Sequence, residues 1–266
     1  MRSDEASLTA RGVALARSRV DRPEWSTGDA AADDRLIASL AEGLDAERRE
    51  RRGGGDSDFL AYLSARTQFF DAAVLRALRE GVDQIIVLGA GYDGRALRYR
   101  TPGVTFFEVD HPATQTDKRR RLREIGASDE GIVFVPADFT ESGLDDALDA
   151  AGHRPRRRTQ FVCEGVLRYL PERSYRELLR VVAARAAPDS ELAVSISTRD
   201  REPTEHERDR ERALAESGEP VLTVPPATLA LEWLEEAGWT PVSVGDAADL
   251  SARARGGRLL VRAARR

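Results

Sequence analysis

The stretch Leu88-Gly89-Ala90-Gly91-Tyr92-Asp93-Gly94 decides the fold, because it sets three glycines at the spacing Gly-x-Gly-x-x-Gly directly after an apolar run. That run, residues 84–88, is rich in β-branched side chains and predicts a buried strand. Glycines let the chain turn tightly and approach a ligand closely, and the amides that open the next helix can face an anion. The motif predicts a strand, a ligand-binding turn and a helix. A turn without a ligand is the alternative.

On both sides of this turn, short apolar runs alternate with amphipathic stretches. Strands are expected at 84–88, 104–109, 132–135, 160–163 and 191–196, and helices at 59–79, 112–125, 144–151, 171–186 and 225–237. Strands of this kind, separated by helices, predict a parallel, doubly wound α/β sheet that is covered on both faces. The runs 239–244 and 258–263 leave no room for a crossover helix, so they predict an antiparallel pair at the sheet edge.

The chain divides into a helical N-terminal extension or cap, residues 1–57, and a cofactor-binding domain, residues 58–266. Helical spacing occurs at 8–20 and 34–44, and the glycine-containing stretch 48–56 predicts a flexible break. Residues 198–219 are strongly charged, which favours an exposed helix. A lid insertion at 198–225 is the alternative.

Composition narrows the function classes. Basic and acidic residues number 41 and 46, a net charge of −5, which argues against nucleic-acid and anionic-membrane partners. No signal peptide or spanning segment is evident, so the cytoplasm is the default compartment. The lone Cys163 is expected to be a buried small hydrophobe, and three scattered histidines predict no metal site. We expect an enzyme that acts on a small molecule and is a monomer or a homodimer.

Acids follow the next two strands. Glu108 and Asp110 end the second strand about 20 residues after the turn, where an acid can bind ribose hydroxyls. Asp138, beside Phe139, suits an adenine, or it caps a helix. Arg66, on the helix before the first strand, could clamp a carboxylate, or it is a surface residue. The pattern fits adenosine in either a nicotinamide cofactor or S-adenosylmethionine.

Four stretches in this order resemble the leucine carboxyl methyltransferase-like family of S-adenosylmethionine-dependent methyltransferases. They are Ala65-Arg66-Thr67-Gln68-Phe69-Phe70-Asp71, Leu88-Gly89-Ala90-Gly91-Tyr92-Asp93-Gly94-Arg95, Phe107-Glu108-Val109-Asp110-His111-Pro112 and Cys163-Glu164-Gly165-Val166-Leu167-Arg168-Tyr169-Leu170. The resemblance covers residues 58–197 and, more loosely, both ends. The family includes enzymes that methylate the C-terminal leucine of protein phosphatase 2A, and tetracenomycin-type polyketide O-methyltransferases.

The resemblance implies the Rossmann-like, mostly parallel, seven-stranded sheet of class I methyltransferases, S-adenosyl-L-methionine as cofactor, and a set of site residues. Arg66 would bind the methionine carboxylate, and Glu164 would face the methionine amine or the methyl-transfer site. Asp110, with Glu108 close by, would hold the ribose. The remaining expected residues are Gly89, Ala90, Gly91 and Asp93 at the turn, Asp138 and Phe139 at the adenine, and Tyr169 beside Glu164 as a candidate for positioning the acceptor.

Two positions depart from the family pattern. The family usually has Thr at the position of Gly94, and a small or apolar residue at the position of Arg168. Gly94 lacks the hydroxyl of that threonine, but its backbone can still form the start of the helix. Arg168 could be a substrate anchor, and a salt-bridge or solvent-facing residue is the favoured interpretation.

The sequence predicts O-methylation of a carboxylate or hydroxyl of a small bacterial metabolite such as a polyketide. His111 is the only histidine near the motifs, and a turn residue is its simpler interpretation. The absence of an evident base favours an acceptor that is already ionised. The alternatives are an NAD(P)-dependent oxidoreductase, which the glycine spacing also fits, and a non-catalytic S-adenosylmethionine-binding protein.

Overall fold

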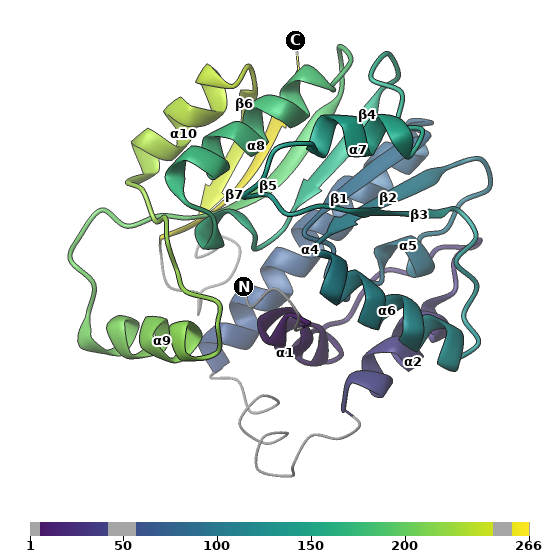
Figure 1. Cartoon of the computed structure of the whole chain (residues 1–266), viewed down its shortest axis with the longest axis horizontal. Coiled ribbons are helices and arrows are strands. Elements are labelled where there is room, and N and C mark those ends of the chain that lie inside the picture. The colour runs from purple at the N-terminus through teal and green to yellow at the C-terminus, as the bar shows by residue number, and fades with distance from the viewer. Residues whose placement is uncertain (1–5, 42–56, 247–256, 266) are drawn as a thin grey trace.

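The computed structural model describes residues 6–41, 57–246 and 257–265. Their core is one seven-stranded sheet of order β3-β2-β1-β4-β5-β7-β6 (Figure 1). The strands are β1 Gln84–Leu88, β2 Thr105–Asp110, β3 Ile132–Pro136, β4 Thr159–Cys163, β5 Glu191–Ser197, β6 Thr240–Asp246 and β7 Arg258–Ala264. The first five pair in parallel, and β7 runs antiparallel to both β5 and β6. The predicted doubly wound sheet and its antiparallel edge pair are both confirmed.

The helices follow the predicted pattern closely. They are α1 Leu8–Arg17, α2 Ala30–Ala41, α4 Ser57–Arg79, α5 Arg95–Arg98, α6 Pro112–Glu124, α7 Leu144–Ala150, the 3₁₀ helix η1 Leu167–Tyr169, α8 Glu172–Ala184, α9 Glu205–Glu216 and α10 Ala227–Glu236. The charged segment contains an exposed helix, α9, which begins with a capping box between Thr204 and Glu207. The flexible break predicted at 48–56 lies outside the described residues.

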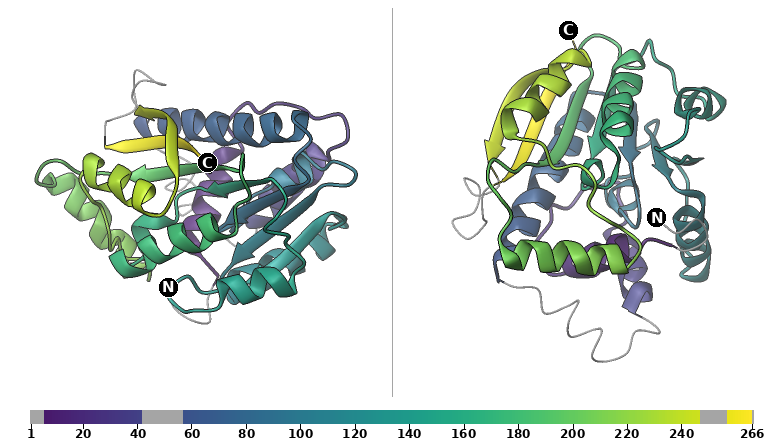
Figure 2. Two further views of the ribbon diagram at one scale, coloured as in Figure 1. Left: turned by 90° about the horizontal axis from the view of Figure 1, so that it is seen from above. Right: turned by 60° about the vertical axis from the view of Figure 1, so that its left-hand side comes forward.

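The sheet is covered on both faces, as its nearly all-apolar strands require. Alternate residues of β1 point to opposite sides, so Ile86 and Leu88 pack with α7, α8 and α10 in one core. Ile85 and Val87 pack with α4 in a second core on the other face. Figure 2 shows α4 on the opposite side of the sheet from α8 and α10. None of the described helices has both the length and the apolar character that a membrane crossing requires.

The strand order reverses between β1 and β4, and open α/β sheets bind their ligands outside the carboxyl ends of the strands at such a point. The N-terminal helices α1 and α2 lie at this edge of the sheet (Figure 1). They pack directly on the elements that follow β1: Ala10 lies against Gly91, and Leu36 packs against Leu97 of α5. The extension therefore packs over the carboxyl end of β1.

Candidate functional site

The glycine turn needs its first two glycines for two physical reasons. Gly89 and Gly91 have φ angles of +63° and +50°, in the left-handed region that side chains disfavour. A Cβ atom on Gly89 would also lie 2.3 Å from Val166 Cγ2, and one on Gly91 would lie 2.8 Å from Ala10 Cβ. Val166 follows β4 and Ala10 belongs to α1, so the turn is held closely between these two elements.

Asp110 braces this turn from the end of β2. Its Oδ2 accepts a hydrogen bond from the Gly91 amide, and its Oδ1 accepts one from the His111 amide at 2.6 Å. Burial raises the pKa of Asp110, although both amide bonds oppose the shift. Behind the turn, Ala90 donates its amide to the Val109 carbonyl at 3.1 Å and is buried.

Gly94 ends the motif with an ordinary φ of −98°, and here the reason for glycine is space. A Cβ atom on Gly94 would lie 1.7 Å from Oδ1 of Asp33, a buried residue of α2. The other oxygen of Asp33 accepts hydrogen bonds from Arg22 Nη1 at 2.7 Å and Arg98 Nε at 2.8 Å. The carboxylate thus fills the space that the larger residue usual in the family would need.

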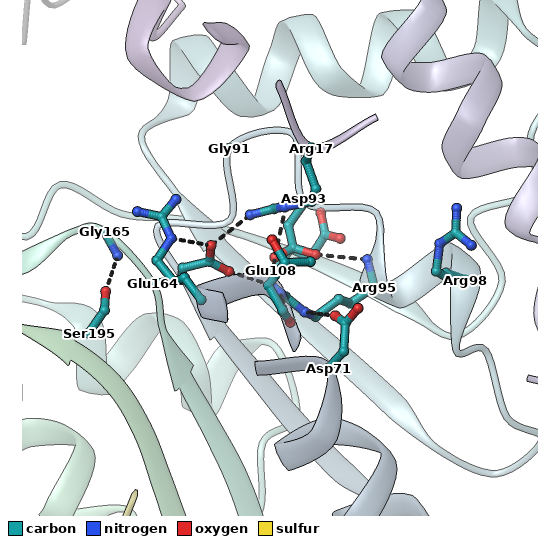
Figure 3. A network of polar contacts seen from close by, with 12 residues as sticks. Arg17, Asp71, Gly91, Asp93, Arg95, Arg98, Glu108, Glu164, Gly165 and Ser195 are labelled. Carbon is teal, nitrogen blue, oxygen red and sulfur yellow. Dashed lines mark hydrogen bonds and ion pairs between the residues drawn. The ribbon is translucent and has the colours of Figure 1, made fainter. Parts of the chain in front are cut away.

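Glu164 is the centre of the polar network that Figure 3 shows. Its Oε1 accepts hydrogen bonds from Arg17 Nη2 and from Arg66 Nε, each at 2.8 Å. Its Oε2 accepts one from Arg95 Nη1 at 2.7 Å. Three arginines from α1, α4 and α5 therefore converge on one carboxylate directly after β4.

Arg95 extends the network to the glycine turn and is completely buried. It donates to Asp93 Oδ2 at 2.5 Å and to Asp71 Oδ1 at 2.7 Å. Asp71 also accepts from Arg22 Nε at 2.8 Å. Buried arginines and carboxylates thus alternate from α4 across the turn to the end of β4, which satisfies each charge with an opposite one.

Burial opposes the ionisation of these carboxylates, but the arginines outweigh it. Burial alone would raise the pKa of Asp71, yet the charge of Arg95 and the hydrogen bond from Arg22 hold it at about 2. Burial acts in the same way on Glu164, and Arg17, Arg95 and Arg66 nevertheless keep its pKa well below the ordinary value. Both groups are therefore ionised at neutral pH.

Glu108 lies under the turn and is engaged there by a lysine. Its Oε2 accepts a hydrogen bond from Lys118 Nζ at 2.5 Å, and the same ammonium donates to the Asp93 carbonyl at 2.7 Å. Both side chains are buried. Lys118 is the single lysine of the chain, and here it ties α6 to the turn.

Three predicted residues lie at the margin of this network. Asp138 and Phe139 follow β3 and are half-buried. Asp138 Oδ1 accepts hydrogen bonds from the Thr140 amide at 2.8 Å and its hydroxyl at 2.7 Å. Tyr169, in η1, is half-buried beneath the Arg168 guanidinium, whose carbon lies 5.7 Å from the ring centroid.

The structure thus brings Arg66, Asp93, Asp110 and Glu164 together at one edge of the sheet. The sequence interpretation missed Arg17, Asp71 and Arg95, which complete the same network. Asp71 and Arg95 lie inside the quoted motifs, so the motifs could have indicated them. Arg17 lies in the amphipathic extension, where nothing in the local pattern distinguishes it.

The comparisons with known proteins agree with this geometry. The sequence model described as leucine carboxyl methyltransferase matches residues 16–183. A Mycolicibacterium smegmatis relative, named as an S-adenosyl-L-methionine-dependent methyltransferase, is 30% identical over 258 residues, which is 92% of this chain and 75% of that protein. Several other relatives are matched over 44% to 50% of their own length.

Two solved structures share the fold at low sequence identity. A DUF574 family protein from Streptomyces avermitilis has a TM-score of 0.61 at 16% identity, with 99% of each chain covered. An O-methyltransferase family protein from Burkholderia thailandensis has a TM-score of 0.50 at 18% identity, with 88% of this chain and 68% of that chain covered. The sheet order, the left-handed glycine turn after β1 and the acid that ends β2 define a class I S-adenosylmethionine-dependent methyltransferase. Within that class, the chain belongs to the leucine carboxyl methyltransferase family.

Proposed function

We propose that this chain transfers the methyl group of S-adenosylmethionine to an oxygen of a small bacterial metabolite. The observation that carries the proposal is the Arg66–Glu164 ion pair, 2.8 Å long, at the carboxyl end of β4 next to the left-handed turn at Gly89 and Gly91. The amino-acid end of S-adenosylmethionine carries both a carboxylate and an ammonium. A site of alternating arginines and carboxylates offers a partner for each.

One unused donor supports the fit of the cofactor. The Nε atom of Arg17 is buried and has no hydrogen-bond partner within the described ranges. A buried guanidinium nitrogen of this kind is expected to find an acceptor oxygen. In our proposal Arg17 and Arg66 share the methionine carboxylate, and Glu164 receives the ammonium.

The remaining cofactor contacts follow the order of the strands. Asp110, at the end of β2, would accept hydrogen bonds from the ribose hydroxyls, because its carboxylate reaches the turn. Glu108 is engaged by Lys118, so its proposed part is to hold the turn from below. Asp138 and Phe139 would contact the adenine from the end of β3.

The bound sulfonium supplies an activated methyl group, and the protein must hold the acceptor in line with it. Tyr169 and Glu164 are the proposed positioning groups. Burial raises the pKa of Tyr169, so its phenol stays protonated and can donate a hydrogen bond. His111 caps α6, with Nδ1 accepting from the Ala113 amide at 3.3 Å, and so serves the fold rather than proton transfer. These features favour a carboxylate or another pre-ionised oxygen as acceptor.

Calorimetric titration with S-adenosylmethionine, S-adenosylhomocysteine and NADH tests the proposal. We expect both sulfur compounds to bind and NADH not to bind. Arg66→Ala should weaken S-adenosylhomocysteine binding by about tenfold or more, about 1.4 kcal/mol. Arg76→Ala is the matched control, because Arg76 lies on the same helix in a half-exposed ion pair with Glu191. Binding of NADH alone would contradict the proposal, and equal affinities of the two variants would contradict the role of Arg66.

A further inference from the structure

Three further arginines lie near Arg66, close enough for their charges to act on one another. We call Arg168 of η1, Arg210 of α9 and Arg258 of β7 the arginine cluster. The guanidinium carbon of Arg258 lies 4.2 Å from the ring centroid of Tyr62, and that of Arg66 lies 5.2 Å from the same centroid. Tyr62 thus joins the cluster to the cofactor site.

No carboxylate of the described residues forms an ion pair with the arginine cluster. Within 6–41, 57–246 and 257–265, no ion pair or hydrogen-bond acceptor engages the guanidinium of Arg168, Arg210 or Arg258. The Nε atom of Arg168 is buried without any partner. Burial lowers the pKa of Arg258, and the positive charges of Arg210, Arg168 and Arg66 add to the shift.

Arg210 is exposed, but surface solvation does not account for the half-buried Arg168 and Arg258. Other arginines of the same charged segment pair locally: Arg201 with Glu207, Arg199 with Glu211, and Arg212 with Asp209. Elsewhere the buried Arg185 pairs with Asp145 and Asp149. Like charges held close together without a carboxylate destabilise the fold. Binding of an anion would explain why these arginines are placed together.

The cluster adjoins the proposed cofactor site through Tyr62. Arg66 donates from Nε to Glu164, and its Nη1 reaches Tyr62 Oη at 3.4 Å. The same tyrosine ring also contacts Arg258 of the cluster. The Arg168 carbonyl accepts hydrogen bonds from the Leu222 amide at 2.8 Å and the Thr223 amide at 3.2 Å. These bonds tie η1 to the segment after α9, which projects below the sheet (Figure 1).

We propose that the arginine cluster binds an oxyanion of the methyl acceptor, a carboxylate or phosphate group separate from the oxygen that is methylated. This inference rests on the proposed function, because it assigns the acceptor class of the same site. Arginine forks suit carboxylates and phosphates, whose oxygens match their planar donors. The group held here is separate from the reacting oxygen, since an oxygen engaged by arginines is a poorer nucleophile.

Benzoate, phenyl phosphate and the neutral benzamide are the probes, each titrated by NMR into the full chain with and without S-adenosylhomocysteine. We expect the two anions to bind and benzamide to bind at least about tenfold more weakly. The ratio of the two anion affinities distinguishes a carboxylate from a phosphate site. Equal binding of benzoate and benzamide would overturn the proposal.

The double variant R168Q/R258Q should lower the anion affinity by about tenfold or more and leave the S-adenosylhomocysteine affinity unchanged. R212Q, on α9 but paired with Asp209, should bind the anions as the unaltered chain does. Unchanged anion binding in the double variant overturns the proposal. Failure of S-adenosylhomocysteine to bind would contradict only the proposed function, because the anions are also titrated without it.

Discussion

Arg17, the last residue of the first helix, donates a hydrogen bond from Nη2 to Glu164 Oε1 at 2.8 Å, although 147 positions separate the two residues. Both side chains are buried. The bond ties α1 to the end of β4. The N-terminal extension is therefore part of the site. Its first helix is held there by the ion pair between Arg17 and the Glu164 carboxylate.

Arg17→Gln should loosen α1 over the glycine turn. The change leaves the neighbouring buried carboxylates with one cation fewer, which costs on the order of 1–3 kcal/mol. Hydrogen exchange should therefore become faster in α1, Leu8–Arg17, and remain unchanged in β1. Mass spectrometry of deuterated peptides measures both.

Arg35→Gln is the matched control for this experiment. Arg35 also lies in the N-terminal extension, but its contact with Asp29 is 3.9 Å long and exposed, so its loss should leave exchange in α1 as it is. Equal exchange of α1 in the Arg17→Gln and Arg35→Gln variants would show that the Glu164 bond does not hold the helix.

The fold was predictable because its signals are local. The apolar runs at 84–88 and 160–163 correspond to β1 and β4, and the short spacing between β6 and β7 predicted their antiparallel pairing. The glycine turn was expected to open a helix, and the structure shows one of four residues, Arg95–Arg98.

The site was less predictable, because its ion pairs join residues that lie far apart in the sequence. Nothing near Glu108 in the sequence indicates that its carboxylate pairs with Lys118. Nothing near Arg17 indicates that it pairs with Glu164. The same holds for Gly94. Its departure from the family pattern is explained by Asp33, which lies on a helix 61 positions earlier (94 − 33 = 61). The Asp33 carboxylate occupies the place where a Cβ atom on residue 94 would lie.

Gly94→Ala should destabilise the chain because the new Cβ atom would meet Asp33 Oδ1. We expect a loss of about 1–3 kcal/mol, the usual cost of overpacking a buried site. Urea unfolding of Gly94→Ala, Asp33→Ala and the double variant measures the coupling. The cost of Gly94→Ala should be smaller in the Asp33→Ala background, since the two changes share one contact.

Gly81→Ala provides the control for glycine replacement as such. Gly81 has a φ of +75°, but a Cβ atom there would meet nothing within 4 Å. Its cost should be backbone strain alone, about 1 kcal/mol, and independent of Asp33. Strict additivity of Gly94→Ala and Asp33→Ala would argue against the steric explanation.

Asp110→Asn should weaken S-adenosylhomocysteine binding by about tenfold or more. The amide keeps the shape of the side chain but cannot accept from both the Gly91 and the His111 amides, so the turn loses a brace and the ribose an acceptor. Calorimetry measures the affinity, with the exposed Asp146→Asn of α7 as control. An Asp110→Asn variant that binds as tightly as the control would refute the ribose assignment.

The pKa of Asp110 adds a pH dependence to this prediction. Because burial raises that pKa, the carboxylate gains its proton at a higher pH than an ordinary aspartate. Cofactor affinity should therefore fall as the pH is lowered towards that value, and this fall should be absent in Asp110→Asn. A fall of the same size in both proteins would assign the pH dependence to another group.

His153 should make the chain less stable between pH 6.5 and about 4. The ring is buried, Arg185 Nε donates to its Nδ1 at 3.1 Å, and Nε2 lies 3.1 Å from the Thr159 hydroxyl. Because an arginine can only donate, Nδ1 must be unprotonated. Burial, together with the charge of Arg185, lowers the pKa of His153 from 6.5 to about 4.

The unfolded chain therefore takes up this proton at a higher pH than the folded chain, and the stabilising contribution is lost as the pH falls through that window. After allowance for solvent screening, the free energy of unfolding should drop by on the order of 1 kcal/mol. Urea unfolding at several pH values measures it. His153→Asn keeps an acceptor for Arg185 without a titrating ring and should show a smaller drop, whereas His111→Asn, on the half-exposed start of α6, should retain the full one. If His153→Asn lost stability as steeply as the unaltered chain, the acid sensitivity would have to come from the carboxylates around Arg95 instead.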